Sequence, residues 1–382
     1  MKKILVIHTN YQTKGGEDIA VENEINFLKK YYEVETLIFS NKKVNSLSTI
    51  FSFILQNNFS SNNILKNKLD IFNPDAVYIH NTWFKLSLGI FKILRNRKVP
   101  VIVKLHNFRY LCASSFTIKG HFEKGGSCMA CGMYLKNKIF NKYYSNSYIK
   151  SFFLILFSKK YLRILQNYNL KIFVLTNFYS DILKQRNFLK DNIYVYPNYI
   201  SSNFYNYDTE SNNSIVYAGR ISYEKGVENL IKAFNELDNN ETTLEIIGTG
   251  PELNRLKKMY SSKKIIFFGE ISNQETLQRI NNSKAVVTAT HQFEGQPTLL
   301  CEASVLGKIS IFPSTGGIEE FFPNDYEYSY EQFNYEDLKN KLKKVIENKV
   351  NYKIVETENK EFLENYLSAN KLKKVFDQCL NE

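Results

Sequence analysis

The chain has 382 residues, of which 43% are hydrophobic and 23% are charged, as is typical of soluble globular proteins. This length predicts two domains rather than a single core. The 5 cysteines are too few for a secreted disulfide scaffold, and the longest apolar stretch, residues 151–157, is too short to span a bilayer.

The net charge of +12 is unevenly distributed along the chain. Residues 1–198 carry 29 Lys and Arg against 11 Asp and Glu, a net charge of +18, whereas the remaining residues carry a net charge of −6. A basic half fits nucleic acid, anionic lipid or a phosphorylated substrate. We therefore expect the two halves to bind different partners.

The first half alternates predicted strands with helical or irregular segments. Its first residues form a short apolar run that turns polar at Thr9, which is too short for a signal peptide and predicts a buried strand in a cytoplasmic protein. Val21–Lys30 suits a helix. Short β-branched or aromatic runs predict strands over residues 4–8, 34–39, 76–80, 101–105 and 172–175. This alternation is typical of parallel βαβ units.

The second half repeats the alternation. Strands are predicted over residues 214–217, 243–247, 265–268, 285–288 and 309–312. Helices are predicted over residues 227–237, 253–260, 274–281, 298–306 and, as a final amphipathic helix, 362–379. The pattern indicates an α/β fold with two Rossmann-like, doubly wound domains. A boundary near Pro197 divides the chain into residues 1–198, residues 199–361 and a terminal segment, residues 362–382.

Polar or glycine-rich segments follow several of these strands. They are Gly15-Gly16, His106-Asn107, Gly219-Arg220, Gly248-Thr249-Gly250, Glu294 and Gly316-Gly317. Ligands of doubly wound sheets bind outside the carboxyl ends of the strands. We therefore expect a ligand cleft between the two halves.

Glu294 and Glu302 flank a predicted loop-to-helix transition. Pro297 fits a first helical position, and the apolar stripe that begins after Thr298 ends at Gly307. The helix N-terminus between the two carboxylates suits a phosphate, and carboxylates accept hydrogen bonds from sugar hydroxyls. The pattern fits a nucleotide sugar, although two solvated surface glutamates would have the same spacing.

Two cations and two glycine segments are further ligand candidates. Arg220 and Lys225 lie five residues apart after a strand and together suit a diphosphate, or else form an ordinary solvated loop. The Gly248–Gly250 turn could hold a base or a ribose. Gly15 and Gly16 precede a helix and would let the backbone approach a phosphate or sugar, or simply form a βα turn.

His106 ends a predicted strand, where it is either a structural histidine or a catalytic or substrate-positioning one. His8 and His80 also end strands and are weaker candidates. A separate Cys-x-x-C motif lies in the first half. Together with nearby residues it gives a possible Zn²⁺ ligand set, the alternative being a free-thiol loop; the candidates are Cys112, His121, Cys128 and Cys131.

Residues 136–171 contain eight Lys or Arg interleaved with aromatic and aliphatic residues. This composition fits an interface with anionic lipid or a nucleic-acid patch. It equally fits core helices with lysines on the solvated face.

The ordered motifs resemble retaining glycosyltransferase family 4, which has the GT-B fold. The resemblance covers nearly the whole chain and is most specific over residues 216–320. Its motifs are Tyr217-Ala-Gly219-Arg220, Glu224-Lys225-Gly226, Ile247-Gly-Thr-Gly250-Pro251, Glu294-Gly-x-Pro297, Glu302-Ala303 and Gly316-Gly317-x-Glu319. Asn107 departs from the pattern, because many relatives have Asp after the histidine.

The resemblance implies a donor site for a UDP- or GDP-sugar in the C-terminal domain. Glu302 would bind the ribose, Glu294 the sugar, and Arg220 with Lys225 the departing diphosphate. Amides near Thr298 and Leu299 would assist, and His106 would contact the sugar. No cofactor or metal is expected. The full donor set is Gly219, Arg220, Lys225, Gly248, Gly250, Glu294, Gly295, Thr298, Leu299 and Glu302.

The resemblance also implies what the remainder of the chain does. The basic N-terminal domain would bind a glycan or polyprenyl-diphosphate-linked acceptor, and the final helix would cross back to that domain. The expected role is hexose transfer in O-antigen, capsule or lipopolysaccharide biosynthesis, with peripheral contact at the inner face of an anionic membrane. A nucleotide-sugar hydrolase or epimerase is the enzyme alternative. The non-enzyme alternative is a basic nucleic-acid-binding protein, but the donor motifs argue against it.

Overall fold

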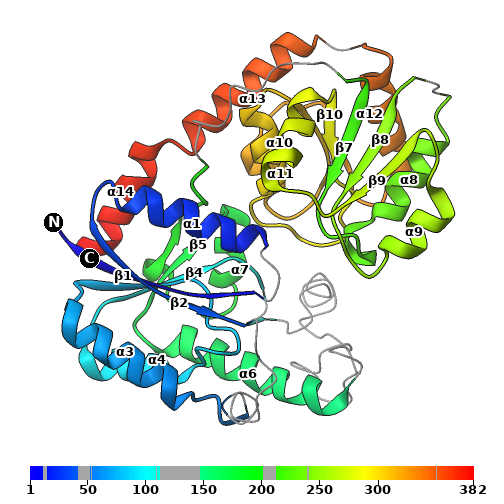
Figure 1. Ribbon diagram of the computed structural model, residues 1–382. Helices are drawn as coiled ribbons and strands as arrows, with labels where there is room; N and C mark the ends of the chain where they lie inside the picture. Colours follow the sequence, from blue (N-terminus) through cyan, green and yellow to red (C-terminus); the bar gives the residue numbers. More distant parts are fainter. Residues whose placement is uncertain are drawn as a thin grey trace. The chain divides into compact units, whose positions relative to one another are not determined.

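The computed structural model describes residues 1–11, 15–41, 52, 54–108, 110–111, 147–200, 212–238, 241–349 and 351–382. The chain divides into two compact units: a first unit of residues 1–199 with 369–382, and a second unit of residues 200–368. Each unit contains one six-stranded parallel sheet with helices on both faces (Figure 1).

The first sheet has the strand order β2-β1-β3-β4-β5-β6. Its strands are β1 (Lys3–Asn10), β2 (Glu33–Ser40), β3 (Ala76–Ile79), β4 (Val101–Leu105), β5 (Lys171–Val174) and β6 (Ile193–Val195). The helices of this unit are α1 (Gly16–Leu28), α3 (Phe59–Phe72), α4 (Gly89–Arg97), α6 (Tyr148–Asn167), α7 (Asn177–Lys184) and α14 (Ala369–Asn381).

One face of the first sheet packs against α1 and α14. Phe27 of α1 and Phe376 of α14 join Val6, Tyr78 and Phe173 of the strands in one buried cluster. Helices α3, α4 and α6 lie on the other face of this sheet (Figure 1). The strand order reverses at β1, whose neighbours are β2 and β3, and this arrangement opens a crevice at the carboxyl ends of β1 and β3.

The second sheet has the order β12-β11-β10-β7-β8-β9. Its strands are β7 (Ser214–Ala218), β8 (Thr243–Ile247), β9 (Ile265–Gly269), β10 (Ala285–Val287), β11 (Ile309–Ser314) and β12 (Ser329–Glu331). The helices of this unit are α8 (Val227–Asn235), α9 (Leu253–Tyr260), α10 (Asn273–Asn282), α11 (Thr298–Val305), α12 (Tyr335–Ile346) and α13 (Tyr352–Tyr366).

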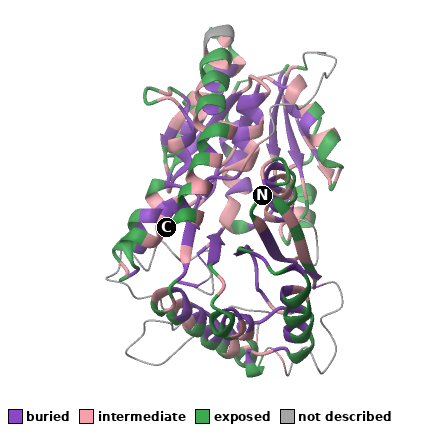
Figure 2. Ribbon diagram, turned by 90° about the vertical axis from the view of Figure 1, so that its left-hand side faces the viewer, coloured by how far each residue is buried: buried purple, intermediate pink, exposed green. Residues whose placement is uncertain are grey.

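Two hydrophobic clusters cover the two faces of the second sheet. One contains Leu230 of α8, Leu256 of α9 and Leu342 of α12, and the other contains Leu277 of α10 and Leu300 of α11. Figure 2 shows the strands as mainly buried and the exposed residues on the outer sides of the helices. Strands buried on both faces explain the near-continuous apolar runs of the sequence. The order reverses at β7, which places the crevice of this unit at the carboxyl ends of β7 and β10.

The predicted fold class, α/β with two doubly wound sheets, is confirmed. The prediction of one final helix over 362–379 is wrong, because α13 ends at Tyr366 and α14 begins at Ala369. Leu363 belongs to the core of the second unit and Leu372 to that of the first. Both helices are amphipathic, so the apolar pattern continues across the break and conceals it.

Candidate active site

Loops from the carboxyl ends of four strands of the second unit contact one another through their backbones. Ile221 N–H, after β7, donates to Thr249 O, after β8, at 2.8 Å. His291 N–H, after β10, donates to Glu224 O at 2.9 Å. Gly317 N–H, after β11, donates to Glu294 O at 2.9 Å. These bonds fix the four loops as one surface at the edge of the sheet.

Two glycines allow this close approach. Gly226 has φ +65°, and a Cβ atom at this position would lie 1.9 Å from Ala289 O. Gly316 has φ +64°, and its Cβ would lie 2.3 Å from Glu294 O. Both positions combine left-handed backbone with direct contact to a neighbouring loop, so only glycine fits without moving that loop.

The structure brings Lys225 and Glu294 together. Lys225 Nζ lies 2.5 Å from Glu294 Oε1, and both side chains are partly exposed. Thr290 Oγ1 donates to the same Glu294 oxygen at 3.0 Å. Thr290 is a site residue that the sequence analysis missed, although its place just after a strand end is the signal that marked Glu294. Arg220 is exposed, and its guanidinium has no partner among the described residues.

The N-terminus of helix α11 lies between the two glutamates, as predicted: Glu294 is in the preceding loop and Glu302 is in the second turn of the helix. The helix begins at Thr298, so Pro297 is the N-cap and not the first helical residue. Burial raises the pKa of Glu302 to about 7. Its carboxylate makes no hydrogen bond within the described part of the chain, so it can accept bonds from a ligand.

The remaining donor candidates lie in the same loops. Gly219 and Arg220 follow β7, and the Gly248–Gly250 turn packs against the backbone of Gly219 and Ile221. Gly295 follows Glu294 in the loop before α11. Thr298 and Leu299 form the first turn of α11, where backbone N–H groups have no partner inside the helix.

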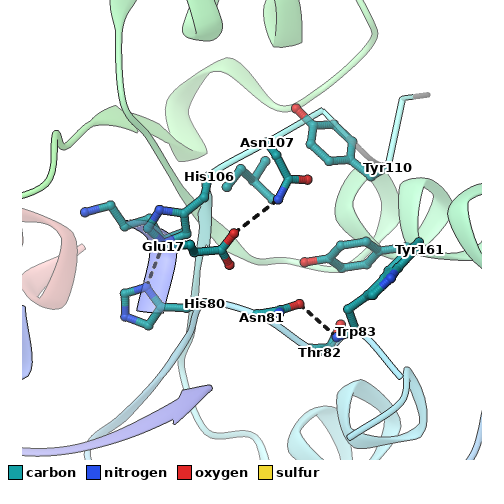
Figure 3. Close-up of a pocket in the computed structure, with 11 residues that line it drawn as sticks. Glu17, His80, Asn81, Thr82, Trp83, His106, Asn107, Tyr110 and Tyr161 are labelled. Carbon is teal, nitrogen blue, oxygen red and sulfur yellow. Dashed lines mark hydrogen bonds between the residues drawn. The ribbon is translucent and has the colours of Figure 1, made fainter. Parts of the chain in front are cut away.

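In the first unit, His80 and His106 meet at the carboxyl ends of β3 and β4. His80 Nδ1 lies 2.9 Å from His106 Nε2, and the rings are stacked. They line a cavity of about 30 Å³, into which Glu17 and Asn107 also point (Figure 3). Asn107 Nδ2 donates to Glu17 Oε2 at 3.3 Å. The departure from Asp at position 107 therefore supplies an amide donor for Glu17.

A second histidine contact lies at the end of β1. His8 Nε2 bonds Asp18 Oδ1 at 2.8 Å, with both side chains buried. Asp18 Oδ2 also accepts from Gly15 N–H at 2.9 Å. Burial would raise the pKa of Asp18, but the bonds from His8 and Gly15 hold it below its ordinary value. Gly15 and Gly16 therefore position the start of α1, which begins five residues before the predicted Val21.

Beneath the histidines lies a buried ion pair that the sequence analysis missed. Lys104 Nζ lies 2.8 Å from Glu24 Oε2, and both side chains are fully buried. Tyr78 donates to Glu24 Oε1 at 2.5 Å. Burial lowers the pKa of Lys104, and Glu24 counteracts that shift. A lysine inside the apolar run Val101–Leu105 was the available sequence signal.

The Cys-x-x-C candidates Cys112, His121, Cys128 and Cys131 lie outside the described residues. Within the described ranges, no three His, Cys, Asp or Glu side chains gather as a metal-binding group. In that same part of the chain, no helix is long and apolar enough to cross a membrane.

Comparisons with known proteins agree with this fold. Residues 205–362 match the family model for glycosyl transferases group 1. An uncharacterized glycosyltransferase of Methanocaldococcus jannaschii is 28% identical over 178 residues, 44% of this chain and 45% of that protein. The chain spans less than half the length of the curated relatives that it matches.

Two solved structures are similar over nearly the whole chain. Anabaena HepE, in complex with UDP-glucose, has a TM-score of 0.72 at 13% identity, covering 100% of both chains. The lipopolysaccharide outer core galactosyltransferase WaaB, in its apo form, has a TM-score of 0.61 at 18% identity, covering 97% of this chain and 99% of that one. The family match is limited to residues 205–362, and the two solved structures, at 13% and 18% identity, show that they share the fold of this chain.

Proposed function

We propose that this protein is a retaining, metal-independent glycosyltransferase that moves a hexose from a UDP- or GDP-sugar. The observation that carries the proposal is the arrangement on the second unit. Glu294 lies in the loop before α11 and pairs with Lys225, which lies just before α8. Glu302 lies in α11 and has no partner among the described residues. The cations and the open amides suit a diphosphate, and the two carboxylates suit the hydroxyl groups of a ribose and a sugar.

The diphosphate is proposed to bind Arg220, Lys225 and the open amides of Thr298 and Leu299. Lys225 would exchange the Glu294 carboxylate for a phosphate oxygen when the donor binds. Negative charge develops on the leaving diphosphate as the sugar departs, and these fixed positive groups would stabilise it. They would supply the charge that a bound metal supplies in other transferases, so no metal or other cofactor is required.

The two glutamates and His106 are proposed to bind hydroxyl groups. Glu302 is proposed to bind the ribose, because its carboxylate accepts no bond in the described structure. Glu294, released from Lys225, would accept bonds from the transferred sugar while Thr290 keeps it oriented. His106 would contact the same sugar. A UDP-glucose complex of the similar structure HepE supports a nucleotide-sugar donor.

The first unit is proposed to bind a glycan or polyprenyl-diphosphate acceptor at an anionic membrane, on the cytoplasmic face. Helices α3, α4 and α6 border a groove of about 800 Å³. None of the described residues that line it is acidic, and its cations are Lys66, Lys92, Arg97, Lys160 and Arg163. Burial lowers the pKa of Lys160, which has no anionic partner among the described residues. Phe59, which lines the groove, is 68% exposed, and Ile149, in the first turn of α6, is 71% exposed.

Such a surface combines charge for anionic headgroups with apolar groups for acyl chains. The similar structure WaaB, a lipopolysaccharide galactosyltransferase, supports a role in the biosynthesis of O-antigen, capsule or lipopolysaccharide.

The test is incubation of the protein with a panel of UDP- and GDP-sugars, with and without bacterial lipid extract. We expect a lipid product heavier by one hexose, and an anomeric configuration that matches the donor by NMR. Free sugar or an epimer formed at the same rate without lipid would indicate a hydrolase or epimerase instead. Salt-dependent binding to DNA or RNA, with no affinity for any donor, would indicate the nucleic-acid alternative.

A further inference from the structure

In the histidine cluster, two buried ring nitrogens have no hydrogen-bond partner among the described residues. They are His8 Nδ1 and His80 Nε2. His8 bonds the Asp18 carboxylate through Nε2, which must therefore carry a proton. His80 is 4% exposed and bonds only His106 through Nδ1. The position of the proton in that bond determines what His106 can offer a substrate.

The His80–His106 bond admits two neutral arrangements. If His106 donates, His80 carries its proton on Nε2 and buries an N–H group without an acceptor. If His80 donates, its Nε2 is a bare lone pair. Orphaned buried N–H groups are rarer in proteins than under-satisfied acceptors.

Both rings are neutral near pH 7. Burial holds the pKa of His80 well below 6.5, and the fields of His106, Lys104 and His8 act in the same direction. Burial, Lys104 and His8 likewise lower the pKa of His106. The carboxylates near the cluster already have partners: Asp18 bonds His8, and Glu24 bonds Lys104. Glu17, which lines the same cavity, accepts bonds from Asn107 and Tyr11.

We propose that His80 donates its Nδ1–H to His106 Nε2 and thereby fixes His106 with its proton on Nδ1. This nitrogen makes no bond within the described residues, and it is not among the buried atoms. His106 is then a hydrogen-bond donor toward its ligand and not a general base. The ligand group it recognises is an oxygen acceptor, such as a sugar hydroxyl, and this last step rests on the proposed function. His80 is a positioning residue.

Side-chain ¹⁵N NMR of the histidines tests the tautomer directly. The chain has 5 histidines, so single His→Gln variants assign each signal. We expect His106 to be protonated on Nδ1 at pH 7, although a solvated imidazole prefers Nε2. His106 protonated on Nε2 in the wild-type protein would overturn the proposal, whatever the variants do.

Two variants test the dependence on His80. In His80→Phe the donor is lost, and we expect His106 to revert toward the Nε2–H form. In His80→Asn the side-chain amide replaces Nδ1–H, and we expect the Nδ1–H form of His106 to persist. A circular dichroism melt checks that both variants fold. If His106 has the same tautomer in folded His80→Phe as in the wild type, His80 does not fix it.

Turnover of the donor distinguishes this proposal from the proposed function. We expect His80→Phe to lower kcat at least tenfold with little change in the Kd of the free nucleotide, and His80→Asn to restore most of it. Equal losses of kcat in both variants would contradict a positioning role for His80. The expected tautomer in a protein that turns over no nucleotide sugar would refute the function and leave the tautomer assignment standing.

Discussion

Lys225 and Glu294 lie 69 residues apart in the chain, and their side chains meet at 2.5 Å at the carboxyl edge of the second sheet. The contact depends on two glycine positions, since Gly226 lets the loop of Lys225 approach Ala289 and Gly316 lets its own loop approach Glu294. The pair therefore holds a cation and an anion in place before a ligand arrives. In the proposed mechanism the ligand separates them.

Replacement of Glu294 should affect turnover more than binding. In Glu294→Gln the side chain keeps its size but loses the charge that the proposed mechanism directs at the sugar, and kcat should fall on the order of 100-fold. The Kd of free UDP or GDP should change by less than about threefold, since neither contains the sugar. Steady-state kinetics and calorimetry measure the two quantities.

The matched control is Glu236→Gln. Glu236 caps the C-terminal end of α8 and forms an exposed pair with Lys339 at 3.4 Å. The Glu236→Gln substitution should leave kcat unchanged. A larger loss of nucleotide affinity than of turnover in Glu294→Gln would contradict the assigned role.

Glu302 should make donor binding depend on pH. With a pKa of about 7 in the empty site, its carboxyl is mostly protonated at pH 6 and mostly ionised at pH 8. Ribose hydroxyls bind the ionised form, so affinity for UDP-glucose should rise about tenfold between these pH values if UDP is the nucleotide. A nucleotide sugar is the suitable probe because its diphosphate has no ionisation in this range.

Glu302→Gln should bind the donor more weakly at pH 8 and lose this pH dependence. The same pKa shift predicts that Glu302 lowers the stability of the empty protein as pH rises from about 4.5 to about 7, because the folded state holds the proton more tightly. A pH profile of affinity that is identical in wild type and Glu302→Gln would exclude this role.

Gly226→Ala should destabilise the protein far more than Gly269→Ala. Both glycines have left-handed backbone, with φ +65° and +74°, so both substitutions cost about 1–2 kcal/mol in backbone strain. Only at Gly226 does the new Cβ meet a backbone carbonyl, whereas nothing lies within 4 Å at Gly269. Urea unfolding measures the difference, and equal losses would show that the loop contact is unimportant.

Replacing one partner of the buried Lys104–Glu24 pair should lower the free energy of unfolding more than replacing both partners. Lys104→Met leaves the Glu24 carboxylate buried without its cation and should cost about 3–5 kcal/mol. Lys104→Met with Glu24→Leu removes both charges and should recover part of that loss. Denaturant midpoints of the single and double variants provide the measurement. If the loss of stability in the double variant equals the sum of the losses in the two single variants, the two charges do not stabilise each other.

The strands could be predicted because each combines an apolar run with a polar or glycine-rich end. The apolar stripe that begins after Thr298 and ends at Gly307 also placed Glu294 in a loop and Glu302 in a helix. The short strands β6 and β12 were missed. The break between α13 and α14 was missed because amphipathic periodicity continues through it.

Pairings between distant residues could not be read from the sequence. Lys104 and Glu24 are 80 residues apart, and His80 and His106 are 26 apart. Each residue alone is ambiguous, because its charge or tautomer is determined by a neighbour that only the folded sheet provides. Parallel sheets bring the ends of separate strands together, and this places the most informative contacts far apart in the chain.

Calorimetric titration of the wild-type protein and Glu302→Gln with a UDP-sugar and a GDP-sugar tests the proposed donor site most directly. We expect one of the two donors to bind at a single site, with an affinity that falls at least tenfold in Glu302→Gln. Binding of neither donor to the folded wild-type protein, or equal affinity in wild type and variant, would contradict the proposed donor site.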